Sequence, residues 1–196
     1  MKKLLPLLVL LACPAISEVI CSISLKEVKG AKITGADVVL VDREKQVIYS
    51  AEYEPTNDTY QVRVPVDKSL TLVIAHPDFC ARIQTVKPSK PVSSTLEKTP
   101  KTGSVMTKNR TCFIPGFGGK QPQGRLNIKG NEGVDDGNLG RLALRANNVS
   151  IEGGKKQPVR FTRRTPLQME DAAGKKVNVK ILDVIGRFAI LQYTFL

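Results

Sequence analysis

Residues 60–66 read Tyr-Gln-Val-Arg-Val-Pro-Val, with an apolar side chain at every second position. This two-residue period is typical of a β-strand with one buried and one solvated face. Leu70, Leu72 and Ile74 continue the same period after a short break, so the two segments predict neighbouring strands.

The pattern extends in both directions from this pair of segments. Alternating or β-rich runs occupy residues 19–28, 36–41 and 47–49, and Ile83 and Val86 close the set. Turn-forming residues separate these runs, as in Glu54-Pro55-Thr56-Asn57-Asp58, and no helical period is present. Six or seven short strands in under 80 residues predict a small antiparallel β-sandwich.

Three stretches of this region carry a family resemblance. They are residues 33–40 (Ile-Thr-Gly-Ala-Asp-Val-Val-Leu), residues 59–65, and residues 70–74 with the following Pro77-Asp78-Phe79. Over residues 19–90 the chain resembles the carboxypeptidase regulatory-like domain, although Pro77-Asp78 stands where that family usually has Pro-Gly. The resemblance implies a transthyretin-like β-sandwich and a non-catalytic accessory role, with no catalytic residue to transfer.

The second half is also expected to be β-rich, and it resembles no family that we recognise. Short alternating runs recur around Leu126, Leu144, Ile151 and Val179, and residues 188–193 predict a buried strand. Residues 87–104 are rich in Pro, Ser, Thr and Lys, which favours an extended linker. The expected organisation is all-β, with segments 1–17 (signal peptide), 18–86 (transthyretin-like sandwich), 87–104 (linker) and 105–196 (basic β-rich domain).

The first seventeen residues have the layout of an export signal. Lys2 and Lys3 precede the apolar run Leu4 to Ala12, and Ala15-Ile16-Ser17 provides small residues before a cleavage site. This arrangement predicts a secreted or periplasmic protein. A second interpretation is a lipoprotein anchored to a membrane, because Leu10-Leu11-Ala12-Cys13 is similar to a lipobox with Cys13 as the acylated residue.

The formal charge of +12 is concentrated in the second half. Residues 1–98 carry 13 Lys and Arg against 11 Asp and Glu, whereas residues 99–196 carry 17 against 7. In an exported protein a basic surface favours an anionic envelope polymer, lipid headgroups or an acidic protein as partner, and disfavours nucleic acid. The densest cluster, and the predicted binding site for such a partner, comprises Lys155, Lys156, Arg160, Arg163 and Arg164.

The cysteines predict at most one disulfide. Cys21, Cys80 and Cys112 remain after the N-terminal segment, and an exported protein favours a bond between two of them. Sequence alone leaves open both the pairing and the alternative that all three are small buried apolar residues.

No pattern of catalytic or metal-binding residues is evident. His76 is the single histidine, so a Ser-His-Asp system has one candidate base, in a Pro-containing turn. Glu52 and Glu54 are explained as solvated charges, and residues 131–138 match no calcium-loop spacing. We therefore expect no cofactor, no metal and no enzymatic activity. The predicted function is an exported, non-catalytic binding or scaffolding protein; the alternative is an exported enzyme or enzyme inhibitor whose site lies in residues 105–196.

Overall fold

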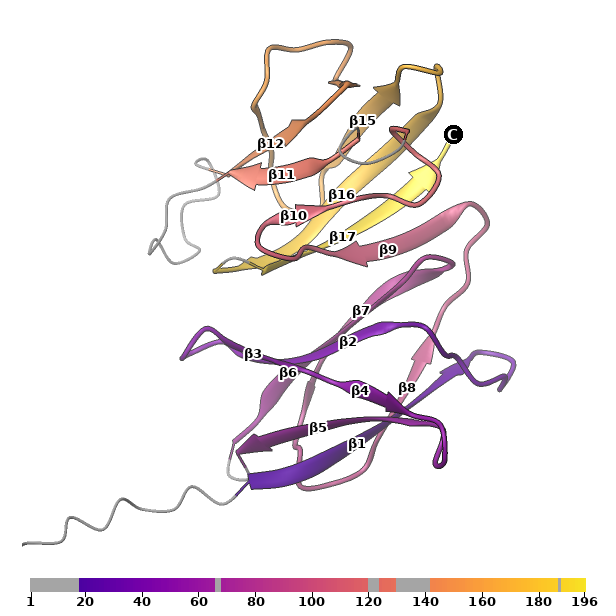
Figure 1. Ribbon diagram of the computed structural model, residues 1–196, viewed down its shortest axis with the longest axis vertical. Helices are drawn as coiled ribbons and strands as arrows, with labels where there is room; N and C mark the ends of the chain where they lie inside the picture. The colour runs from indigo at the N-terminus through magenta and orange to yellow at the C-terminus, as the bar shows by residue number, and fades with distance from the viewer. Residues whose placement is uncertain (1–17, 66–67, 120–123, 130–141, 187) are drawn as a thin grey trace, which may run out of the picture.

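The computed structural model describes residues 18–65, 68–119, 124–129, 142–186 and 188–196. Within these ranges the regular structure consists of β-strands, with no helix, which confirms the all-β prediction. The strands group into four sheets, here named A to D. Figure 1 shows the two sheets of residues 18–96, the N-terminal half, in the lower part of the view, and those of residues 102–196, the C-terminal half, above them.

The N-terminal half contains sheets A and B. Sheet A has the order β4-β5-β1-β8 and sheet B the order β3-β2-β6-β7. The strands are β1 (Glu18–Glu27), β2 (Asp37–Asp42), β3 (Val47–Ser50), β4 (Glu52–Glu54), β5 (Thr59–Pro65), β6 (Leu70–His76), β7 (Phe79–Val86) and β8 (Val92–Leu96). The alternating residues that opened the sequence analysis, including Tyr60, Val62 and Val64, face a core shared by the two sheets.

The C-terminal half contains sheets C and D, with the orders β13-β15-β16-β17-β9 and β10-β11-β12-β14. The strands are β9 (Thr102–Met106), β10 (Thr111–Cys112), β11 (Leu126–Lys129), β12 (Ala143–Ala146), β13 (Val149–Ile151), β14 (Val159–Arg160), β15 (Pro166–Asp171), β16 (Lys176–Ile185) and β17 (Phe188–Phe195). A second core lies between these sheets, and Leu126, Leu144, Val179 and Leu191 are among its fully buried members.

A third apolar core joins the two halves. In β2, Val38 and Leu40 face sheet A, whereas Val39 and Val41 face the C-terminal half. Met106, Ile185, Phe188 and Ile190 of sheet C pack against these valines. Sheets B and C are therefore covered on both faces, which explains why β2 and β17 are almost continuously apolar.

Polar contacts also tie the halves together beside this core. The buried Ser104 hydroxyl donates to the carbonyl of Phe79 at 2.9 Å and accepts from the His76 amide at 3.0 Å. The Tyr193 hydroxyl donates to the Pro77 carbonyl at 2.8 Å, and the Gln192 side chain accepts from the Ala81 amide at 3.3 Å. The turn between β6 and β7 is thus bonded directly to strands β9 and β17.

The linker expected at residues 87–104 contains regular structure instead. Residues 92–96 form β8, which pairs in parallel with β1, and residues 102–104 begin β9. Ser94 and Leu96 are buried because this strand completes sheet A. The prediction was wrong here because the abundance of Ser and Thr was attributed to a solvated connector, although Thr is also common in strands.

The predicted disulfide is absent: the cysteines of the described residues, Cys21, Cys80 and Cys112, are all free. Cys21 belongs to the core of the N-terminal half and Cys112 to that of the C-terminal half, so the two thiols are held in separate interiors. Burial raises the pKa of both thiols, that of Cys112 to about 12. These two cysteines act as small apolar residues, which agrees with the alternative for two of the three cysteines, whereas Cys80 is only half-buried.

The N-terminal segment 1–17, including Cys13, lies outside the described residues. Among the residues that are described, we find no helix of the length and hydrophobicity that a membrane crossing requires.

Candidate functional site

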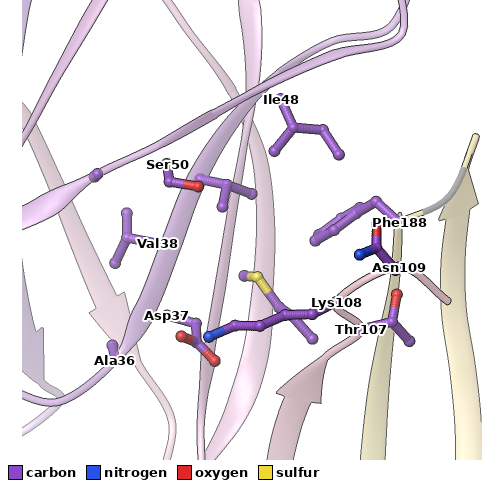
Figure 2. Close-up of a pocket in the computed structure, with 12 residues that line it drawn as sticks. Ala36, Asp37, Val38, Ile48, Ser50, Thr107, Lys108, Asn109 and Phe188 are labelled. Carbon is purple, nitrogen blue, oxygen red and sulfur yellow. The ribbon is translucent and has the colours of Figure 1, made fainter. Parts of the chain in front are cut away.

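A pocket of about 320 Å³ lies where the two halves meet. One wall is formed by strands β2 and β3, with Ala36 before β2 and Ala51 after β3. The other wall is formed by the end of β9, the residues that follow it and the start of β17. Figure 2 shows Asp37, Val38 and Ser50 on the first wall, and Lys108, Asn109 and Phe188 on the second. The volume is within the range of small-molecule sites, which often form between structural units.

The acidic wall is fixed by the start of β2. Asp37 is the first residue of that strand and is exposed, whereas the next five residues are buried. The preceding Ala36 amide donates to the Tyr60 hydroxyl at 2.9 Å, and the Ala51 amide donates to the Val38 carbonyl at 2.9 Å. These bonds hold Asp37 at the mouth of the pocket.

The basic wall is fixed by a tight hairpin. The Lys108 amide donates to the Thr111 carbonyl at 2.8 Å and the reverse bond is 3.0 Å, so Asn109 and Arg110 form a two-residue turn. Both turn residues have positive φ, 50° and 63°, as a type I′ turn requires. In Figure 2 the Lys108 side chain extends from this turn in the direction of the Asp37 carboxylate.

Between these walls the pocket has an apolar interior. Phe188 and Met106 are nearly fully buried, and Ile48 is partly exposed. Thr107 secures this region, since its amide donates to the Ala189 carbonyl at 2.9 Å and its hydroxyl accepts from the Ala189 amide at 2.8 Å. An apolar interior with one carboxylate and one ammonium at the rim is an arrangement typical of small-molecule sites.

The sequence analysis did not single out any residue of this pocket. Asp37 and Lys108 are ordinary charged residues 71 positions apart, and only the contact between the halves brings them to one cavity. The available signal was the run of apolar residues in β2, whose two-sided burial implies that another sheet covers it.

The predicted basic cluster is only partly a surface feature. Lys155, Lys156, Arg160 and Arg164 are exposed, in the turn after β13, in β14 and in the loop that follows it. Arg163 instead points inward, where its Nη1 lies 3.2 Å from Oδ1 of the buried Asp183. Arg163 is therefore a structural residue at the contact between the two halves, contrary to its predicted place in an anion-binding surface.

His76 has a structural role in its turn. Its Nδ1 accepts from the Asp78 amide at 3.0 Å, so the neutral ring carries its proton on Nε2, which lies 3.1 Å from the Thr34 carbonyl oxygen. The ring packs edge-on against Phe79, with centroids 4.9 Å apart. Both nitrogens are thus occupied by backbone groups.

The remaining acidic candidates form no metal site within the described ranges, which contain no cluster of three or more potential ligands. Glu52 and Glu54 line a separate cavity of about 360 Å³ beside sheet A, where Glu54 accepts from the Thr56 amide at 3.1 Å. The acidic segment 131–138 lies outside the described residues.

The loop that follows β10 is anchored by Asp171 at the β15–β16 hairpin. Its carboxylate accepts from the amides of Gly118, Ala173 and Lys175, each at 3.0 Å. Burial raises the pKa of this carboxyl, but the three amides and the Lys175 ammonium outweigh that effect, so the pKa is lower than usual.

We expect D171N to lower the free energy of unfolding by about 1–2 kcal/mol near neutral pH, because the amide keeps the size of the side chain but loses charge-assisted bonds. The native pKa lies below the unfolded value of about 3.9, so this contribution is present above that pH and is lost as the pH falls through the native pKa. Urea unfolding between about pH 6 and pH 2 checks this: the two proteins should converge in acid, and a constant difference would contradict it.

No family model matches the chain. A curated protein does: the chain is 28% identical over 176 residues to the 3' cyclic ADP-D-ribose synthase AaTIR of Aquimarina amphilecti. The aligned region covers 89% of this chain and 49% of the relative, so the chain spans about half the length of the protein it matches.

This similarity contradicts the prediction of a non-catalytic binding or scaffolding protein, because the relative is an enzyme. The composition and the absence of known catalytic motifs were given too much weight. A single histidine argues against a Ser-His-Asp triad, and the solvated Glu52 and Glu54 argue against a catalytic carboxylate pair. Neither observation excludes other kinds of catalysis. The alternative prediction, an enzyme, agrees better with the comparison.

Proposed function

We propose that this chain belongs to an enzyme that acts on ADP-ribosyl nucleotides, and that the pocket between its halves holds the nucleotide. The pocket carries the proposal, because it combines an apolar interior with one acidic and one basic side chain at its rim. The similarity to a 3' cyclic ADP-D-ribose synthase gives the class of ligand, which contains an adenine ring, ribose hydroxyls and a diphosphate.

Each chemical group of such a ligand has a counterpart in the pocket. The Asp37 carboxylate is an acceptor for ribose hydroxyls, and the Lys108 ammonium pairs with the diphosphate. Phe188, Met106 and Ile48 offer apolar surface to the base. The walls come from both halves, so the site extends beyond residues 105–196, where the alternative prediction had placed it.

Two properties predicted from sequence are compatible with this role and are proposed with it. Residues 1–17 act as an export signal or, through Cys13, as a lipid anchor. Sheets A and B form a transthyretin-like sandwich, with the C-terminal half as a second domain. The excess of positive charge favours encounter with an anionic nucleotide.

Calorimetric titration of the whole chain with NAD⁺ and with 3' cyclic ADP-ribose, together with chromatographic assay of NAD⁺ turnover, tests the proposal. We expect K108Q to weaken nucleotide binding by about tenfold or more, since one charge-assisted contact contributes about 1.5–3 kcal/mol. D37N should weaken it less, because an amide oxygen still accepts a hydroxyl proton.

K90Q is the matched control for K108Q, and E97Q is the matched control for D37N. Each control removes an exposed charge of the same sign as its counterpart, at a position outside the pocket. They should bind nucleotide as the unmodified chain does. Equal weakening in the controls, or no binding at millimolar nucleotide, would remove the pocket from consideration.

A further inference from the structure

The outer face of sheet D is basic. Along β11, β12 and β14 the apolar side chains point to the core, so the alternate residues point outward. Arg145 and Arg160 are among these outward residues, and Arg125 precedes β11 with the same orientation; all three are exposed. Arg145 and Arg160 thus lie on neighbouring strands of one surface.

Strand register places these three arginines on one diagonal. Asn127 pairs with Arg145, so Arg125, two residues earlier, is a diagonal neighbour of Arg145. Ala143 pairs with Arg160, so Arg145, two residues later, is likewise a diagonal neighbour of Arg160. Diagonal neighbours in a sheet are about 7–8 Å apart, so the three residues follow one diagonal across sheet D, here named the arginine stripe.

In the part of sheet D that the structure describes, no carboxylate interrupts the stripe. Strands β10, β11, β12 and β14 contain neither Asp nor Glu, and in the described part of the chain no ion pair involves Arg125, Arg145 or Arg160. Arg125 lies 5.9 Å from the Phe113 ring centroid, a cation–π contact that leaves its guanidinium able to bind an anion. Within the described residues, the three guanidinium groups therefore have no carboxylate as an ion-pair partner.

We infer that the arginine stripe binds a linear phosphodiester polymer, through its phosphates and independently of any base. Three arginines at successive diagonal positions of one sheet can each bind a phosphate of a chain that follows this diagonal. A lipid surface fits less well, because Asn127, which pairs with Arg145, and Thr111, which pairs with Asn127, are polar, and Ala143, which pairs with Arg160, is buried. This surface is built from the C-terminal half alone and is separate from the nucleotide pocket.

The test is fluorescence-anisotropy titration of the whole chain with a labelled abasic deoxyribose-phosphate oligomer. We expect R125E/R145E/R160E to weaken binding at least tenfold. The logarithm of the unmodified protein's binding constant should fall against the logarithm of salt concentration with a slope of about −2, as three phosphate contacts on a single strand predict. If that variant does not fold, as judged by its far-ultraviolet circular dichroism, R125Q/R145Q/R160Q carries the same test.

K155E/K156E/R164E is the matched control, because it makes the same change in net charge at the exposed part of the cluster predicted from sequence. This control should lose at most about threefold in affinity, the effect of net charge alone. Equal losses in the two variants would overturn the stripe as a site. Binding of oligo-dT without binding of the abasic oligomer, or binding only to anionic vesicles, would overturn the phosphodiester assignment.

Discussion

Gly103→Ala should lower the free energy of unfolding by about 3 kcal/mol or more, the larger end of the range for overpacking. A Cβ atom at Gly103 would lie 1.8 Å from the Pro77 carbonyl oxygen and 2.5 Å from the Tyr193 hydroxyl. The first of these is a backbone atom in the turn that joins β6 to β7, so no side-chain rotation relieves the clash.

The neighbours of Gly103 are themselves bonded in place. Tyr193 is opposite Gly103 in the β9–β17 pairing, and its hydroxyl donates to Pro77. Burial, with a smaller effect from Asp78, raises the pKa of the Tyr193 hydroxyl to about 12, so the hydroxyl remains a donor at ordinary pH. The added methyl group must therefore displace a β-turn or separate the two halves.

Thermal unfolding measured by circular dichroism checks this prediction. A loss of about 3 kcal/mol corresponds to a fall in Tm of roughly 6–12 °C for a chain of this size. Gly153→Ala is the control, because its Cβ would meet nothing within 4 Å and it tests only the cost of positive φ, here 69°. That cost is about 1–2 kcal/mol. Equal Tm values for the two variants would show that β9 and the Pro77 turn are not in close contact.

The sequence predicted individual strands better than it predicted how sheets pack. Alternation located β1, β5 and β11, because a strand with one buried face has a period of two. In β6 the same rule selected Leu70, Leu72 and Ile74 and overlooked Val73 and Ala75, which are equally buried. Those two residues face the C-terminal half, and two-sided burial of this kind is the signal for a third core.

The candidate site could not be predicted either, because it also depends on how the sheets of the two halves pack. Its residues are ordinary ones, and the pocket exists only because two separately formed cores meet. Arg163 illustrates the limit of charge counting: in sequence it is one of several neighbouring cations, whereas in the fold it pairs with a carboxylate 20 residues later. Local composition gives the number of charges, but tertiary contacts decide which of them face solvent.

Asp183→Ala should also destabilise the chain strongly, by about 3 kcal/mol, because it leaves cations at the junction without their counter-charge. Asp183 is buried, and its carboxylate contacts Arg43 from the N-terminal half and lies 3.2 Å from Arg163 Nη1. The same side chain accepts from the Val184 amide at 2.9 Å, next to the register shift in β16. One carboxylate thus connects both halves and a β-bulge.

The expected loss is below the upper values for buried pairs, since the Arg43 side chain remains 43% exposed and is partly stabilised by water. Arg43 also keeps the bond from its Nε to the Thr71 hydroxyl at 3.0 Å. In a double-mutant cycle, D183A with R43M should therefore cost less than the sum of the two single changes, by about 1–2 kcal/mol.

Glu170→Ala is the matched control, because Glu170 and Lys176 form an ion pair at 3.6 Å in which both side chains are about half exposed. Removing such a pair should change the free energy of unfolding by less than about 0.5 kcal/mol. Urea denaturation of D183A and E170A separates the two cases. If D183A costs no more than E170A, the carboxylate does not hold the halves together, and the junction depends on its apolar core alone. If D183A is costly, loss of this ion pair should also weaken nucleotide binding, since the pocket has one wall from each half.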